Sequence, residues 1–191
     1  MLLTISLHCL NLGLRAMLET QLRSEGCIVT MHGEVNVTVD VPSGTALFER
    51  LVLTRTVFVT DNPCHEHWLD VLESGVMGFI AGSANWGSLL EAVQCVHHGQ
   101  QYQKHAVVLS RLKPAQRKVL RLVALTLDNK SIADKLGVKP QTVRDCISEI
   151  LEELRSSHPE LLLKNSRQLA FYYWGLWHQL QTRVVFAPLQ L

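Results

Sequence analysis

Apolar and polar residues follow two different periods along this chain. In the first half, short runs rich in β-branched residues, such as TISL, VNVTV and TVFVT, alternate with stretches whose apolar positions recur at helical spacing. Such alternation is typical of an open, mostly parallel sheet with helices on its faces. From about residue 112 onward the spacing is helical throughout. The pattern therefore predicts an α/β half followed by an all-α half.

The pattern also places individual elements. The predicted strands are 2–7, 27–31, 35–41, 56–60 and 76–80, and the predicted helices are 11–24, 45–52, 66–73, 86–97, 114–125, 130–136, 140–156 and 166–181. Between the second and third strands, the stretch GCIVTMHGEVNVTVDVPSG leaves no room for a helix. One βα unit is therefore expected to be missing or reduced, and the topology of residues 25–56 stays open.

Charge separates the two halves. Residues 1–103 hold 4 Lys/Arg against 10 Asp/Glu, whereas residues 104–160 hold 11 against 7 and residues 161–191 hold 3 against none. Because 191 residues suffice for two small domains, we place an α/β domain at 1–103, a linker at 104–111 and a helical domain at 112–191. The basic second domain is the candidate for a polyanionic partner.

Several protein classes are excluded by composition. Apolar runs end well before the roughly 18 residues of a membrane helix, and the start lacks the basic residue and the cleavage site of a signal peptide. The five cysteines are odd in number and contain no C-x-x-C pair, which indicates reduced thiols in a cytoplasm. No paired carboxylates or nucleophile-plus-base motif points to an enzyme. We expect a cytoplasmic, non-enzymatic protein that crosses no membrane.

The stretch NKSIADKLGVKPQTVRDCISEIL, residues 129–151, has the spacing of two helices that cross through a tight turn. Ala133 is small where two helices would touch, Gly137 suits a left-handed helix end, and Pro140 suits a first helical position. The second helix would then expose Lys139, Gln141, Thr142, Arg144 and Asp145 at the end that enters a major groove in a helix-turn-helix. An ordinary helical hairpin with a solvated charged face is the alternative.

The longer segment LKPAQRKVLRLVALTLDNKSIADKLGVKPQTVRDCISEILEEL resembles the LuxR-type helix-turn-helix of NarL/FixJ-class response regulators over some 43 residues. This resemblance implies a four-helix DNA-binding domain in which Lys130 and Thr142 contact phosphates. The DNA-contacting residues that it implies are Lys113, Asn129, Lys130, Lys139, Gln141, Thr142, Arg144 and Asp145. Cys146 and Glu153 depart from the family's usual His and Lys, so the family's target sequence is not carried over.

The first half resembles a receiver domain that has lost its chemistry. TVFVTDNPCHEHWLDVLESG and GVMGFIAGSANWGSLLEAVQCVHHGQQY are similar to the last two strand-helix units of receivers, which have a flavodoxin-like fold. Receiver phosphorylation requires an aspartate, an acidic pair that binds Mg²⁺ and a lysine. Where the acidic pair should follow the first strand, the chain has TISLHC, which contains no carboxylate, and Gly82 stands where the lysine would be. Asp40 is left as the one candidate phosphoacceptor, so we expect a pseudo-receiver with no cofactor.

Two further stretches could carry a site. The cluster CHEH at Cys64–His67 offers metal-ligand types, but no second pair has zinc-finger spacing, so no metal site is predicted. The segment after residue 165 holds six of the chain's twelve aromatic residues, in a stripe too wide for core packing alone. The predicted dimerisation residues there are Leu169, Tyr173, Trp174, Leu176, Trp177 and Leu180. A contact of this segment with the N-terminal half of the chain is the alternative.

Together these patterns predict a shortened receiver-like domain and a LuxR-type helix-turn-helix domain in one transcription regulator. Its expected partners are double-stranded promoter DNA and a second copy of the chain, with a heterodimer of related regulators and RNA polymerase as further candidates. One alternative is a protein-interaction module whose helix-turn-helix contacts a partner regulator or RNA polymerase instead of DNA. The other is an enzyme that uses the Cys64–His67 cluster, against which the missing paired carboxylates and nucleophile-plus-base motif argue.

Overall fold

The computed structural model describes residues 3–41, 55–82, 87–108 and 110–176, and the structural statements below concern this part of the chain. Contacts divide the chain into two compact units. The α/β unit comprises Met1–Pro63 and Trp68–Val108, and the helical unit comprises Cys64–His67 and Leu109–Leu191. The predicted helix at 45–52 lies outside the described residues.

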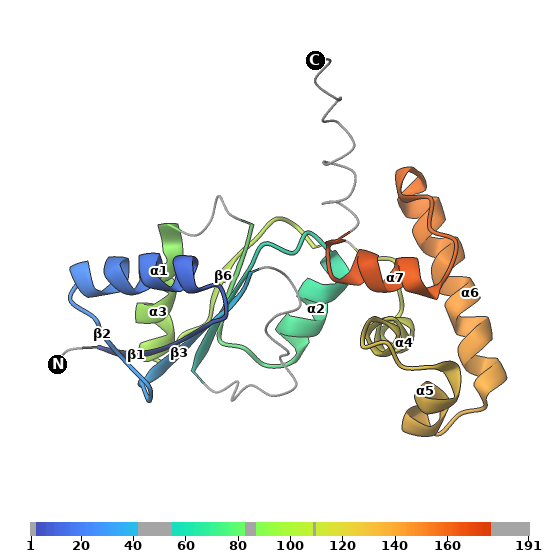
Figure 1. The fold of residues 1–191 in the computed structure, drawn as a ribbon, viewed down its shortest axis with the longest axis horizontal. Coiled ribbons are helices and arrows are strands. Elements are labelled where there is room, and N and C mark those ends of the chain that lie inside the picture. Colours follow the sequence, from blue (N-terminus) through green and yellow to red (C-terminus); the bar gives the residue numbers. More distant parts are fainter. Residues whose placement is uncertain (1–2, 42–54, 83–86, 109, 177–191) are drawn as a thin grey trace, which may run out of the picture. The chain divides into compact units, whose positions relative to one another are not determined.

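The α/β unit contains a six-stranded sheet in which every neighbouring pair of strands is parallel (Figure 1). Its strands are β1 (Thr4–Cys9), β2 (Ile28–Thr30), β3 (Val35–Asp40), β4 (Thr56–Thr60), β5 (Gly78–Ala81) and β6 (Tyr102–Lys104), in the order β2-β1-β3-β4-β5-β6. The first five strands have the flavodoxin-like order. The predicted receiver-like fold class is therefore confirmed, and β6 is an additional edge strand that the sequence pattern did not indicate.

Helices cover both faces of this sheet (Figure 1). The helices α1 (Leu12–Ser24) and α3 (Leu89–His97) bury Leu18, Leu22, Val93 and Val96 against the valines of β3 and β4. On the other face, Trp68 and Val71 of α2 (His65–Glu73) pack with Phe58 and Phe79. Alternation along each strand therefore supplies two separate apolar layers.

The connection between β2 and β3 explains the shortened sequence. Only four residues, 31–34, link the end of β2 to the start of β3, although β1 lies between these strands. A parallel crossover ordinarily needs a dozen residues or more. Here the link passes directly over β1, and a Cβ on Gly33 would come within 2.3 Å of the Ser6 backbone nitrogen. The expected missing βα unit is thus replaced by a tight loop that only glycine permits.

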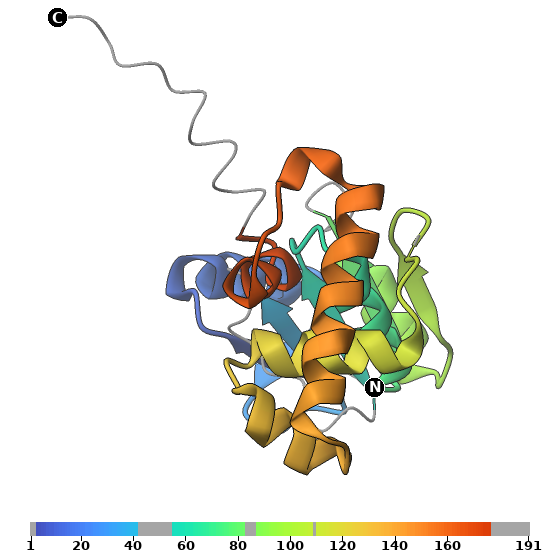
Figure 2. The ribbon, with the colours of Figure 1, turned by 90° about the vertical axis from the view of Figure 1, so that its right-hand side faces the viewer.

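The helical unit contains α4 (Pro114–Ala124), α5 (Asn129–Leu136), α6 (Pro140–Ser157), a short 3-10 helix at Pro159–Leu161 and α7 (Ser166–Tyr173) (Figures 1 and 2). Figure 2 shows α6 in the foreground, with α4 and α5 beside it. Apolar side chains from all four α-helices form one core, which includes Leu120, Ile132, Val143, Ile150 and Leu169. Within the described residues, no helix has the length and hydropathy that crossing a membrane would require.

The helix α7 is shorter than the prediction of 166–181. It ends at Tyr173 because Gly175 adopts a left-handed conformation with φ of +69°. The Gly175 amide then donates to the Tyr172 carbonyl at 3.0 Å, a bond that closes the last turn. Residues 177–181 lie outside the described part of the chain.

Candidate nucleic-acid interface

The first helix of the predicted helix-turn-helix is α5, and a side chain caps its start. Oδ1 of Asp128 accepts a hydrogen bond from the Ser131 amide at 2.7 Å. This bond, together with the nearby Lys130, holds the pKa of the Asp128 carboxyl below its ordinary value. The capping carboxylate satisfies an amide that would otherwise lack a helical partner. The cap therefore determines that α5 begins at Asn129, and it fixes the positions of Asn129 and Lys130 in the first turn.

The turn between α5 and α6 depends on Gly137. Its φ of +65° and ψ of +33° are left-handed, and the Val138 amide reaches back to the Ala133 carbonyl at 3.0 Å. Lys139 then returns to extended backbone, and Pro140 occupies the first helical position of α6. The predicted roles of Gly137 and Pro140 are confirmed by this geometry. No Cβ contact would arise at Gly137, so the requirement for glycine comes from the backbone conformation.

One face of each helix is buried in the core of the helical unit. Ile132 and Ala133 of α5 are fully buried. Val143 and Ile150 of α6 are at most 1% exposed. Ala133 lies where the two helices approach, so a larger side chain there would separate them. This packing determines which residues of α6 point outward.

The outward face of α6 begins with the residues that the sequence singled out. Lys139, Gln141, Thr142, Arg144 and Asp145 are all exposed. The first turn of α6 contains no acidic residue, so the positive end of the helix dipole is not offset by a carboxylate there. Lys113 and Lys130 are exposed at the starts of α4 and α5, whereas Asn129 is half-buried. The exposed residues at the start of α6, namely Lys139, Gln141, Thr142, Arg144 and Asp145, are called the α6 leading surface below.

Three of these side chains are joined to one another. Gln141 Nε2 donates to Asp145 Oδ1 at 2.7 Å. Gln141 Oε1 accepts from both Nε and Nη2 of Arg144, at 3.1 and 2.7 Å. The residues stand three and four positions apart, which places them on one side of the helix. Sequence analysis identified each residue but not their connection.

A hydrogen bond between two side chains also connects α4 with α6. The Gln116 amide in α4 donates to Glu149 of α6, and its oxygen accepts from the Lys113 backbone N–H. Gln116 therefore links the start of α4 to the middle of α6. The sequence pattern does not predict this contact, because two positions 33 residues apart carry no local signal of contact.

The predicted dimerisation residues divide into two groups. Leu169 and Tyr173 are 0% exposed and belong to the core. The prediction that they form a dimer contact must therefore be corrected, because both side chains pack inside the helical unit. Trp174 and Leu176 are half-buried, and the Trp174 indole donates to the Ala124 carbonyl at 2.9 Å. Trp177 and Leu180 lie outside the described residues. Phe171, which the prediction omitted, is exposed on α7.

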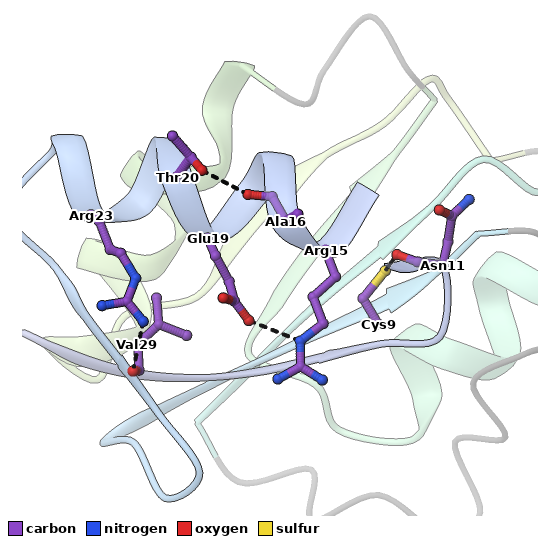
Figure 3. Close-up of polar contacts among 8 residues, drawn as sticks. All are labelled: Cys9, Asn11, Arg15, Ala16, Glu19, Thr20, Arg23 and Val29. Carbon is purple, nitrogen blue, oxygen red and sulfur yellow. Dashed lines mark hydrogen bonds and ion pairs between the residues drawn. The ribbon is translucent and has the colours of Figure 1, made fainter. Parts of the chain in front are cut away.

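The edge of the sheet where a receiver would be phosphorylated lies at the carboxyl ends of β1, β3 and β4. Asp40 ends β3 and is fully buried, with Thr60 beside it in the register of β4. Figure 3 shows the loop after β1, where the Cys9 thiol donates to the Asn11 carbonyl at 3.4 Å, and Arg15 of α1 pairs with Glu19 at 2.8 Å. Burial raises the pKa of the Cys9 thiol, and Arg15 and the Asn11 backbone oppose that rise.

These residues do not fit a magnesium ion. Mg²⁺ binds hard oxygen ligands, usually from one or two carboxylates. The loop after β1 supplies a thiol and an amide, and Gly82 follows β5 with φ of +84° where a lysine would be needed. The buried Asp40 carboxylate alone does not make a metal-assisted phosphorylation site.

The Cys64–His67 cluster is also not arranged as a metal site. Cys64 is buried and its thiol donates to Glu66 Oε2 at 3.4 Å. Burial raises the pKa of this thiol, and the Glu66 charge raises it further. Burial lowers the pKa of His67 to about 3. Among the described residues, no group of three His, Cys, Asp or Glu side chains is placed to hold a metal ion.

Several solved structures have a fold similar to that of this chain. No protein-family model matches the sequence, and no curated protein matches it. The structure of two RcsB dimers bound to two parallel DNAs is similar, with a TM-score of 0.54, 15% identity, and coverage of 92% of this chain and 100% of that chain. RcsB from Salmonella enterica serovar Typhimurium, bound to a promoter in the presence of the phosphomimetic BeF3−, is also similar. Its TM-score is 0.52 at 16% identity, with coverage of 91% of this chain and 98% of that chain.

A third structure, a complex of the two-component response regulator RcsB with DNA, has a TM-score of 0.51 at 16% identity and covers 92% of this chain and 100% of that chain. At such low sequence identity, the similarity shows the fold alone. The chain therefore has the fold of the two-component response regulator RcsB, with a receiver-like α/β part followed along the sequence by an all-α part.

Proposed function

We propose that this protein is a sequence-specific transcription regulator that binds double-stranded promoter DNA with the α6 leading surface. The observation that carries the proposal is the division of α6 into two sides. Val143 and Ile150 are buried in the core, while Lys139, Gln141 and Arg144 are exposed at the helix start. The N-terminal residues of a second helix are those that contact base edges in helix-turn-helix proteins. The similar RcsB structures contain DNA, which supports the same use of this fold.

Phosphate binding would come from the starts of the neighbouring helices. Lys130 in α5 and Lys113 at the start of α4 are exposed, and helix N-termini direct free amides and a positive dipole toward anions. Such contacts position a protein on a duplex without reading its sequence. Thr142 of α6 would add a hydroxyl contact. Base selection is then assigned to Arg144 and its neighbours.

The α/β unit would act without phosphorylation, as an interaction or sensing module. This part of the proposal is supported by the burial of Asp40, by a β1 loop without carboxylates, and by Gly82 in place of a lysine. A cytoplasmic location follows from the proposal, because the chain must reach promoter DNA. RNA polymerase would be a further partner.

Binding would involve a dimer. Two copies of a helix-turn-helix that read half-sites about one helical turn apart, roughly 34–36 Å, would match a promoter sequence of two-fold symmetry. The exposed Phe171 and half-buried Trp174 offer aromatic surface on α7 for that contact. A related regulator could replace the second copy.

The proposal is tested by genome-wide footprinting of the tagged full chain, followed by gel shifts on the recovered promoters. Lys139→Ala with Arg144→Ala should abolish specific binding. Glu152→Ala, an exposed position farther along α6, should leave it intact. If the wild-type chain shifts no duplex and instead co-purifies with a regulator or RNA polymerase, the interaction-module alternative replaces this proposal.

A further inference from the structure

The bonds within the α6 leading surface assign different tasks to Gln141, Arg144 and Asp145. Gln141 uses its amide oxygen for Arg144 and its amide nitrogen for Asp145. This orientation is chemically required, since a reversed amide would direct N–H donors at the guanidinium and an oxygen at the carboxylate. Gln141 therefore holds both neighbours at once.

The hydrogen-bonding capacity of Gln141 is nearly used up by these contacts. A glutamine that reads adenine must accept from N6 with its oxygen and donate to N7 with its nitrogen. The Gln141 oxygen already accepts from Nε and Nη2 of Arg144, and its nitrogen retains one free hydrogen. Direct adenine reading would require the existing bonds to break. Gln141 is thus better suited to position another residue than to read a base.

Arg144 is held by one edge and leaves the other edge available. A guanidinium has five N–H donors in a planar fork, and Gln141 occupies the edge formed by Nε and Nη2. The end-on edge, formed by Nη1 and the second hydrogen of Nη2, has no partner among the described residues. Two parallel donors at that edge match the O6 and N7 acceptors of guanine.

Asp145 completes the arrangement on the other side. Its Oδ1 accepts from Gln141 at 2.7 Å, which leaves Oδ2 as an acceptor. A carboxylate oxygen in a major groove accepts from the N4 amino group of cytosine and repels acceptor edges. Gln141 therefore holds Arg144 and Asp145 side by side at the start of α6.

We propose that Gln141 is a positioning residue that presents Arg144 to guanine, so that each half-site contains a G·C pair in contact with Arg144 and a neighbouring cytosine opposite Asp145. The inference rests on the proposed DNA-binding function and adds to it the base that is read. Preference for guanine over the other bases should be about 5- to 150-fold, the range expected for one bidentate pair.

The test begins with selection of bound sequences from a random duplex library by the full wild-type chain. In the recovered site, the guanine is replaced by 7-deazaguanine, which keeps base pairing but removes the N7 acceptor. Affinity should fall by about tenfold, the loss of a good hydrogen bond to a charged group. Inosine at the same position changes only the minor-groove edge and should leave the affinity unchanged.

The positioning role is tested with Gln141→Met, which keeps an unbranched side chain but removes both amide contacts. The preference for guanine should fall toward equality, while affinity for random duplexes stays within about twofold because phosphate contacts remain. Gln141→Glu alone would face the Asp145 carboxylate, so it is combined with Asp145→Asn, whose side-chain amide can donate to the new carboxylate. This double variant still offers Arg144 an acceptor and should keep the preference for guanine at the position that Arg144 contacts. Ser156→Met places the same side chain on an exposed position at the far end of α6 and should change neither quantity.

The outcomes distinguish a failure of the proposed DNA-binding function from a failure of the positioning role of Gln141. A wild-type chain that enriches no sequence overturns the proposed function and this inference with it. Enriched sites without a guanine contacted by Arg144, an unchanged preference in Gln141→Met, or an equal loss for all duplexes would overturn only the inference. A site with adenine whose selection is lost in Gln141→Met would show that Gln141 reads the base itself.

Discussion

Gln116 Nε2 in α4 donates a hydrogen bond to Glu149 Oε2 in α6 at 3.2 Å, while Gln116 Oε1 accepts from the Lys113 amide at 2.9 Å. Gln116→Glu would keep the second bond but replace the first by two facing carboxylates. The free energy of unfolding should fall by about 1 kcal/mol, the size of one lost hydrogen bond. Urea titration measures this, and adding Glu149→Gln to the variant should recover the loss. A deficit that persists in the double variant would contradict the pairing.

Gly137 supports a second prediction, because its φ of +65° is unfavourable for any residue with a Cβ. Gly137→Ala should destabilise the helical unit by about 1–2 kcal/mol, although no neighbouring atom would obstruct the methyl group. Gly137→Asn should cost less, since asparagine tolerates left-handed backbone better. Thermal unfolding followed by circular dichroism compares the two. Equal losses in both variants would show that the turn depends on something other than backbone conformation.

Gly33 is sensitive for a different reason. A Cβ there would lie 2.3 Å from the Ser6 nitrogen and 2.4 Å from the Ile5 carbonyl carbon, both backbone atoms of β1 that have nowhere to move. Gly33→Ala should therefore destabilise the α/β unit by about 3 kcal/mol, the upper end of the usual cost of overpacking. Hydrogen exchange at β1 and β2 measures the loss.

The matched control for Gly33 is Gly26→Ala, at the other end of β2. Gly26 has φ of +82° but no atom within 4 Å of an added Cβ, so only backbone strain of about 1–2 kcal/mol is expected. If Gly33→Ala proves no worse than Gly26→Ala, the loop does not cross β1 as closely as the structure shows.

Much of this architecture is visible in the sequence, and the reason is local. The turn between α5 and α6 combines a left-handed glycine, a proline at a first helical position and buried residues at helical spacing, so each signal acts within a few residues of the next. The strands β3 and β4 are equally clear because β-branched residues make up most of them.

Other features were not predicted, either because they depend on residues distant in sequence or because a stronger pattern concealed their local signal. The strand β6 consists of three residues with polar character, and only pairing with β5 makes it a strand. Gly33 is required because of β1, which is distant in sequence. Gly175 did carry a local signal for the end of α7, but the aromatic stripe on both sides of it favoured a longer helix. The bonds of Gln141 were missed because side-chain pairing is weaker than periodicity as a sequence signal.

The chemistry at the carboxyl ends of β1, β3 and β4 leads to a prediction about phosphorylation. Acetyl phosphate with Mg²⁺ should leave the full chain unmodified, because Asp40 is buried and has neither an acidic pair nor a lysine at the expected positions. Intact-protein mass spectrometry measures the added phosphate. A stable acyl phosphate that disappears in Asp40→Asn would show that the receiver chemistry survives.

Lys130 and Arg144 should contribute to DNA binding in distinguishable ways. Arg144→Ala removes the proposed base contact and should cost roughly 1–3 kcal/mol on the selected site while relaxing base choice. Lys130→Ala removes a phosphate contact, so all duplexes should weaken together and the slope of log affinity against log salt should flatten by about one. Fluorescence anisotropy at several salt concentrations separates the two effects. Small, equal losses in both variants would mean that neither side chain contacts the duplex as proposed, since phosphate and base contacts differ in their response to salt.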